Sequence, residues 1–230
     1  MKLPRLSCCR SGCATRAAAG KKICISCRKF AVEIKLKTMI LPIVAYGSPS
    51  LRMVSKDIDA KYPDLEKLIA NMWETMYASN GVGLAAPQVN RNIRLFMVDS
   101  VQIFNNQEED EKGQYPDEPG IKQAFINASI KELNGKEWVY NEGCLSIPKI
   151  REDITRNELV TIEYLDENFE LHTTSFSGIT ARIILHEYDH IEGKLFIDHL
   201  KPFKRKLMKG KLDDISKGKI KVDYKMSFVK

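Results

Sequence analysis

The sequence contains no run of the roughly 18 to 20 consecutive apolar residues that a membrane-spanning helix needs, which excludes such a span. It also lacks the composition of a disordered, collagen-like or disulfide-dense chain, because 43% of its 230 residues are hydrophobic and 29% are charged. No internal repeat is present. This composition is typical of a soluble globular protein, and the length suits one full domain or two small ones.

Cysteine is nearly absent from residues 39–230, which contain only Cys144. The other five cysteines lie in residues 1–38. The rest of the chain therefore has no disulfide framework, which suits a reducing cytosol and leaves one thiol free for chemistry. We expect a cytoplasmic protein, with organelle targeting by residues 1–38 as the alternative.

Residues 1–38 also carry ten Lys or Arg and one acid, a balance of +9, whereas the remainder has a balance of −3. A basic, acid-poor segment is typical of transit peptides. Four of its cysteines form two closely spaced pairs, which loosely fit a zinc site with basic flanks for nucleic acid: Cys9 with Cys13, and Cys24 with Cys27. The favoured interpretation is an extension outside the fold, with the true start at Met39.

Hydrophobic periodicity predicts two helices. Apolar residues recur at three- and four-residue steps from about residue 62 to Tyr77, and a second helical pattern covers residues 178–191. Strands are expected at 92–99, 124–128, 137–140, 159–165 and 169–174, the last two as a hairpin. A polar, acidic loop exposed to solvent is expected at 104–120, and a basic C-terminal tail at 201–230.

Strands dominate this pattern, and the helices do not alternate with them in βαβ units. The predicted fold class is α+β, with mainly antiparallel sheets packed around the helix at 178–191 and one further long helix on its N-terminal side. The catalytic domain is expected to span residues 39–200. We expect a monomer.

The most informative motif is His-Glu-Tyr-Asp-His at residues 186–190. Residues four apart lie on one face of a helix, so His186 and His190 can bind a single metal ion. Glu187 lies beside that face, where its carboxylate can take a proton from a metal-bound water. A chance pairing is a weak alternative, because the chain has only four histidines.

A catalytic site built on two histidines needs a third protein ligand and an open position. The third histidine of a metzincin protease is missing, since Phe196 stands in its place, and the downstream glutamate of a thermolysin-like protease is missing too. Cys144 is the remaining candidate, because a thiolate is a strong, soft ligand. Two histidines and one cysteine suit zinc or ferrous iron.

The segment Gly81–Gln88 combines small residues with an amide side chain. Small residues let a substrate backbone approach closely, and Gln88 offers a donor for an oxyanion. Alone, such a Gly-x-Gly turn is weak evidence, and it lacks the third glycine of a nucleotide-binding loop.

Together, in this order, the three motifs resemble peptide deformylase. They stand at Gly81–Gln88, Glu142–Ser146 and His186–His190, and the resemblance covers about residues 39–200. It implies hydrolysis of the N-formyl group from the N-terminal methionine of newly synthesised proteins, with release of formate. It also implies one divalent metal ion per chain, held by Cys144, His186 and His190: Fe(2+) in the cell, with Zn(2+), Ni(2+) or Co(2+) as substitutes.

The same resemblance implies roles for further residues. Glu187 would deprotonate the water and later protonate the leaving amine, while the N–H of Leu145 and the side chain of Gln88 would stabilise the oxyanion. Glu142 is expected to orient the Cys144 loop by pairing with Arg156. The substrate-binding residues expected are Val82, Gly83, Gly143, Ile179 and Ile183.

Two other functions compete with this hypothesis. A zinc metallopeptidase would cleave unformylated peptides, and a zinc-stabilised binding protein would need a fourth protein ligand that no motif supplies. The basic tail is expected to be a solvated end, with ribosomal RNA contact as the alternative that the resemblance suggests. The expected partners are N-formylmethionyl nascent peptides, with neither DNA nor a membrane among them.

Overall fold

The computed structural model describes residues 38–106, 117 and 119–228, all within one unit of the chain. The interpretations of residues 1–38 concern a segment of which only Thr38 is described. Most of the predicted acidic loop at 104–120 also lies outside the described residues. Within the described ranges, no helix is long and apolar enough to cross a bilayer.

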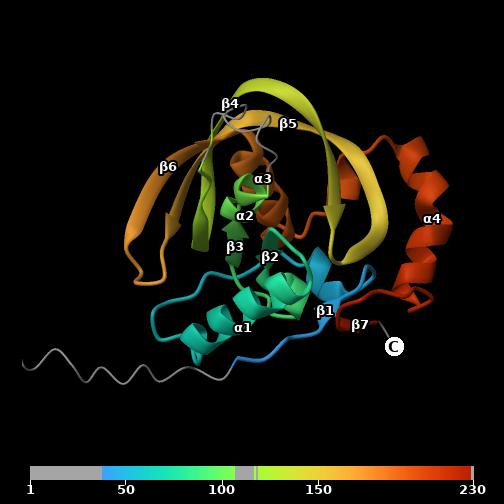
Figure 1. The fold of residues 1–230 in the computed structure, drawn as a ribbon, viewed down its shortest axis with the longest axis horizontal. Helices are drawn as coiled ribbons and strands as arrows, with labels where there is room; N and C mark the ends of the chain where they lie inside the picture. Colours follow the sequence, from blue (N-terminus) through green and yellow to red (C-terminus); the bar gives the residue numbers. More distant parts are fainter. Residues whose placement is uncertain (1–37, 107–116, 118, 229–230) are drawn as a thin grey trace, which may run out of the picture. The chain divides into compact units, whose positions relative to one another are not determined.

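A five-stranded sheet forms the body of the fold (Figure 1). Its order is β2 (Gly83–Ala85), β3 (Leu95–Asp99), β4 (Lys122–Cys144), β5 (Ile147–Leu165) and β6 (Leu171–Ser177). Every neighbouring pair in it is antiparallel. A small second sheet pairs β1 (Ile43–Val44) in parallel with β7 (Met226–Ser227). The predicted α+β class with a mainly antiparallel sheet is confirmed.

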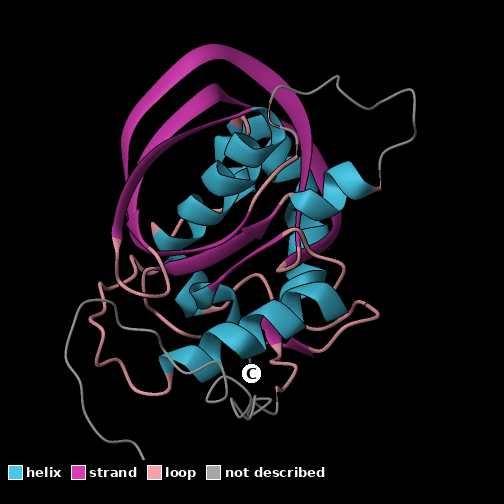
Figure 2. Cartoon of the chain, turned by 60° about the vertical axis from the view of Figure 1, so that its left-hand side comes forward, coloured by secondary structure: helices cyan, strands magenta, loops and turns pink. Residues whose placement is uncertain are grey.

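The helices are α1 (Leu65–Ala78), α2 (Val101–Asn105), α3 (Gly178–Ile191) and α4 (Pro202–Ser216), with short 3-10 turns η2 (Pro49–Arg52), η3 (Ala86–Val89) and η4 (Phe196–His199). Helix α3 lies inside the curve of the long strands (Figure 2) and contacts β2, β3, β5 and β6. Nearly all of its residues are buried, and beside its apolar side chains these include the polar Arg182, Glu187, Asp189 and His190.

Asp117 caps the N-terminus of α3 from the far end of the predicted acidic loop. Its carboxylate accepts a 2.7 Å hydrogen bond from the N–H of Thr180. Gly178 has φ +55°, and a Cβ there would stand 2.3 Å from the Asp117 carboxylate. Negative charge is favourable at a helix N-terminus. The expectation of a merely solvated acidic loop is therefore wrong for this residue.

The structure corrects two further expectations. The strands predicted at 124–128 and 137–140 are parts of the single strand β4, whose middle is exposed and so lacks the alternation that marks a half-buried strand. The basic segment from Lys201 is not a solvated end, because it forms α4 and β7. Met208, Leu212 and Ile215 are buried at helical spacing among its lysines.

Candidate metal centre

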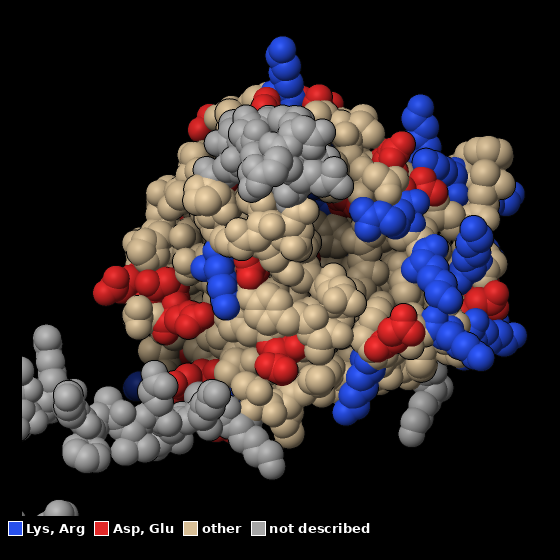
Figure 3. Space-filling model, viewed as in Figure 1, with Lys and Arg blue, Asp and Glu red and all other residues tan. Residues whose placement is uncertain are grey.

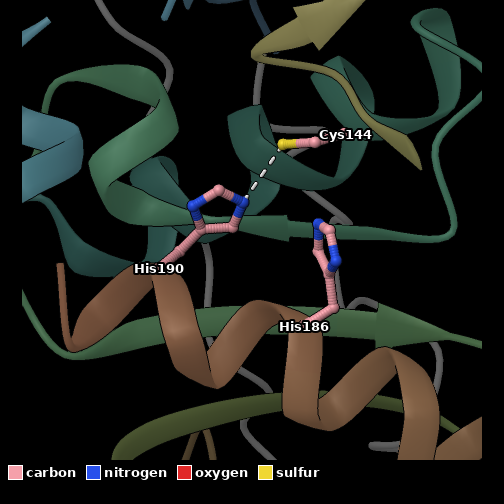
Figure 4. Close-up of side chains that lie close together, drawn as sticks. All are labelled: Cys144, His186 and His190. Carbon is pink, nitrogen blue, oxygen red and sulfur yellow. Dashed lines mark hydrogen bonds between the residues drawn. The ribbon is translucent and has the colours of Figure 1, made fainter. Parts of the chain in front are cut away.

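Three predicted ligands meet at one point (Figure 4). Cys144 ends β4, and His186 and His190 project from successive turns of α3. Their ligand atoms lie within 4.8 Å of one another, and the Cys144 Sγ is 3.2 Å from the His190 Nε2. Among the described residues, no fourth side chain joins this group. A thiolate and two imidazoles with an open position fit a divalent transition-metal ion.

The electrostatics of the cluster favour a thiolate. Burial raises the pKa of Cys144, but the neighbouring His190 and His186 outweigh it and lower that pKa to about 5. Cys144 is therefore ionised at neutral pH, as a metal ligand must be. His186 places its Nδ1 2.8 Å from the Glu142 carboxylate, which leaves its Nε2 facing the cluster. Such a contact fixes the orientation of a ligating imidazole.

A buried ionic network supports His186 through Glu142. Arg156 places its Nε 2.7 Å from Glu142 and its Nη1 2.7 Å from Asp189. The expected pairing of Glu142 with Arg156 is therefore present. Burial opposes ionisation of Glu142, but hydrogen bonds from His186 and Arg156 hold its pKa well below the ordinary value. Asp189 and Arg182, which is 3.1 Å from Glu142, join this network, a role that the sequence analysis did not assign.

Glu187 points into the same site. Its side chain is almost wholly buried, and its Oε2 has no hydrogen-bond partner among the described residues. Burial raises the pKa of Glu187 to about 7. A carboxyl group with a pKa near neutrality can both accept and return a proton at working pH.

The two predicted oxyanion donors lie beside the ligands. The Gln88 Oε1 accepts a 2.8 Å hydrogen bond from the N–H of Ala85, which fixes the amide group. Its Nε2 is 3.5 Å from the Cys144 Sγ and 3.4 Å from the Ser146 Oγ. Leu145 follows Cys144 directly, in the two-residue turn between β4 and β5.

A cavity of about 780 Å³ opens onto this site. Its lining includes every expected substrate-binding residue: Val82, Gly83, Gly143, Ile179 and Ile183. Gln88, Leu145 and Glu187 also face it, together with residues 221–224 of the C-terminal segment. The sequence does not predict that residues 221–224 line the cavity, because nothing in its local pattern places residues after α4 at the site.

A family model described as polypeptide deformylase matches residues 40–206. A peptide deformylase of Christiangramia forsetii is 55% identical over 192 residues, which cover 83% of this chain and 96% of the relative. The chain belongs to the polypeptide deformylase family. This confirms the predicted resemblance, and with it an enzyme that removes the N-formyl group from nascent peptides.

Solved structures of peptide deformylases also match the fold of this chain. A peptide deformylase from Legionella pneumophila matches with a TM-score of 0.66 and 32% identity, covering 79% of this chain and 98% of that one. A Plasmodium falciparum peptide deformylase in complex with an inhibitor matches with a TM-score of 0.62 and 34% identity, covering 75% and 97%. The family match favours the deformylase over the metallopeptidase and the binding protein.

Proposed function

We propose that this chain hydrolyses the formyl amide at the cluster of Cys144, His186 and His190, with Glu187 as the group that moves the proton. One observation carries this proposal. The buried carboxylate of Glu187, which has one oxygen without a hydrogen-bond partner among the described residues, stands beside three metal-ligating atoms at the wall of a cavity of about 780 Å³. A purely structural metal site needs neither the cavity nor the carboxylate.

When bound, a divalent metal ion supplies Lewis acidity at this cluster and lowers the pKa of water beside it. Glu187 takes the proton from the attacking water and returns it to the leaving amine, which its pKa of about 7 permits. The side chain of Gln88 and the N–H of Leu145 donate to the developing oxyanion. Each such donor is typically worth about 3 kcal/mol of barrier.

The cavity supplies the binding groups for a formylmethionyl end. Val82, Ile179 and Ile183 offer apolar walls for the methionine side chain. Gly143 lies at the end of β4, where its backbone can pair with an extended peptide as an added strand.

For the metal we propose Fe(2+) in the cell, with Zn(2+), Ni(2+) or Co(2+) as substitutes. Zinc binds such donor sets more tightly than ferrous iron, so metal availability decides which ion is present. The Cys144 thiolate beside a ferrous ion is open to oxidation, and we expect the iron form to lose activity in air.

We further propose that the enzyme acts as a cytoplasmic monomer and contacts the ribosome through α4. Lysine and arginine side chains gather over this helix (Figure 3). Phe203 and Leu207, four residues apart on α4, are 74% and 68% exposed. A basic helix with an uncovered apolar pair suits contact with both RNA phosphates and protein.

The proposal is tested by incubating the enzyme without oxygen with formyl-Met-Ala-Ser and, separately, with acetyl-Met-Ala-Ser. Hydrolysis of the formyl peptide is followed by the release of formate. We expect formate from the formyl peptide, no hydrolysis of the acetyl peptide, and loss of activity with a chelator. Cleavage of peptide bonds in unformylated Met-Ala-Ser would instead support a metallopeptidase. No formate after loading with iron, nickel or zinc would refute the proposal.

A further inference from the structure

The chain segment that follows α4 returns to the active-site cavity. Residues 221–224 line it, and β7 then pairs with β1. The N–H groups of Ile43 and Ala45 donate to the carbonyls of Lys225 and Ser227, at 2.9 and 2.8 Å. These bonds anchor the segment immediately after it passes the site.

Tyr224 is the residue of this segment that reaches the catalytic turn. Its hydroxyl donates a 2.7 Å hydrogen bond to the carbonyl of Leu145. Both side chains are half-buried against the same apolar cluster. The neighbouring carbonyl of Ser146 accepts a 2.8 Å bond from the N–H of Tyr46. The C-terminal segment therefore holds Leu145, and the chain just after β1 holds Ser146.

We infer that Tyr224 is a positioning residue, which fixes the backbone of Leu145 so that its N–H points at the oxyanion. This inference rests on the proposed role of the Leu145 N–H. A two-residue turn has few bonds of its own, and the carbonyl of Leu145 lies on the peptide next to the one that carries this N–H. Without the tether the turn can rotate, and a donor that must be aligned before reaction loses part of its effect.

The test is Tyr224→Phe in the full chain, loaded with nickel or iron under anaerobic conditions and assayed with formyl-Met-Ala-Ser. The variant keeps the aromatic packing and removes only the donor. We expect kcat to fall three- to thirtyfold with KM changed less than twofold, and with metal content and Tm near those of the wild type. A loss in the transition state alone gives this split between kcat and KM.

Tyr77→Phe is the matched control, because the Tyr77 hydroxyl also makes a short hydrogen bond, at 2.6 Å to Asp99, but outside the cavity lining. We expect wild-type kcat for it. A kcat of Tyr224→Phe within twofold of wild type, or a change in KM alone, overturns the inference. Gln88→Ala identifies the cause: if its kcat falls while that of Tyr224→Phe does not, the oxyanion site stands without Tyr224. If neither falls, the oxyanion site itself is wrong.

Discussion

The carboxylate of Glu187 occupies the space that a side chain at Gly83 would need. A Cβ at Gly83 would stand 2.5 Å from the Glu187 Oε1 and 2.8 Å from its Cδ. Glycine in β2 therefore allows α3 to approach the sheet closely enough to bring Glu187 to the cluster. Gly83, expected as a backbone contact for substrate, also makes room for the proposed base.

Gly83→Ala is expected to displace Glu187 and lower kcat at least tenfold while metal content stays unchanged. The reason is steric, since the three ligands lie elsewhere on α3 and β4. Steady-state kinetics with elemental analysis checks this. Gly210→Ala on α4 is the control, because nothing lies within 4 Å of a Cβ there. It should keep full activity and gain a little stability from helix propensity. Wild-type kcat in Gly83→Ala would contradict the argument.

Glu187→Gln is expected to keep the metal and lose turnover by about 10²- to 10⁴-fold, the usual contribution of a general base. Glutamine has nearly the same shape but cannot accept the proton. Metal content and kcat should be measured on the same preparation. Glu192→Gln, which weakens a partly buried ion pair with Arg94 just after the end of α3, serves as control and should remain active. A fully active Glu187→Gln would show that another group moves the proton.

The central part of the site could be predicted because its residues follow local rules. His186 and His190 are one helical turn apart, and Glu187 is adjacent in sequence, so a helix at 178–191 brings all three to one place. Cys144 was found by elimination, as the only thiol after residue 38. Gln88 stood out as an amide donor at the end of a small-residue segment, and the family resemblance added the role of the Leu145 N–H, which spacing alone does not indicate.

The remaining features depend on contacts between distant segments. Tyr224 meets Leu145 across 79 positions, and Arg182 reaches Glu142 across 40. A lysine-rich stretch after α3 predicts a solvated end of the chain. Only the contact of α4 with β5 shows that this stretch is a helix packed on the sheet. The length of β4 was missed for a related reason, since its exposed middle has no buried face to create a pattern.

Arg156→Gln is expected to raise the pH at which the protein unfolds in acid. Arg156 helps to hold the pKa values of Glu142 and Asp189 below their ordinary values. Their contribution to the free energy of unfolding is thus fully present above the unfolded pKa values, near about 4, and is lost as pH falls through the folded ones. Without Arg156 the folded pKa values rise toward 4, so stability is lost at higher pH.

The variant should also be destabilised at neutral pH by about 3 to 5 kcal/mol, because it leaves buried carboxylates without their cation. Circular dichroism during acid titration and urea unfolding at pH 7 measure both effects. Arg52→Gln is the control, since Arg52 pairs with Asp198 at the surface, where such a pair contributes little. Equal acid midpoints for Arg156→Gln and wild type would contradict the proposed network.

The proposed ribosome contact predicts that reversing charge on α4 weakens association with ribosomes without affecting hydrolysis of a free tripeptide. Lys206 and Lys209 are exposed on α4 and make no ion pair with another described residue, so Lys206→Glu with Lys209→Glu reverses charge without breaking the fold. Sedimentation with purified ribosomes at several salt concentrations should give a lower affinity and a shallower salt dependence than wild type, because fewer phosphate contacts release fewer counterions.

The control for this double variant is Lys61→Glu with Lys67→Glu, which changes the net charge by the same amount. Both lysines are exposed, Lys61 just before α1 and Lys67 in its first turn. If α4 is the contact, this control binds ribosomes as the wild type does. An equal loss of affinity in both variants would mean that net charge alone drives association and that α4 has no special part in it.

Phe203→Ser tests the apolar contribution of α4 to ribosome binding. It should weaken binding at high salt, where salt screens the phosphate contacts but does not weaken the burial of the ring.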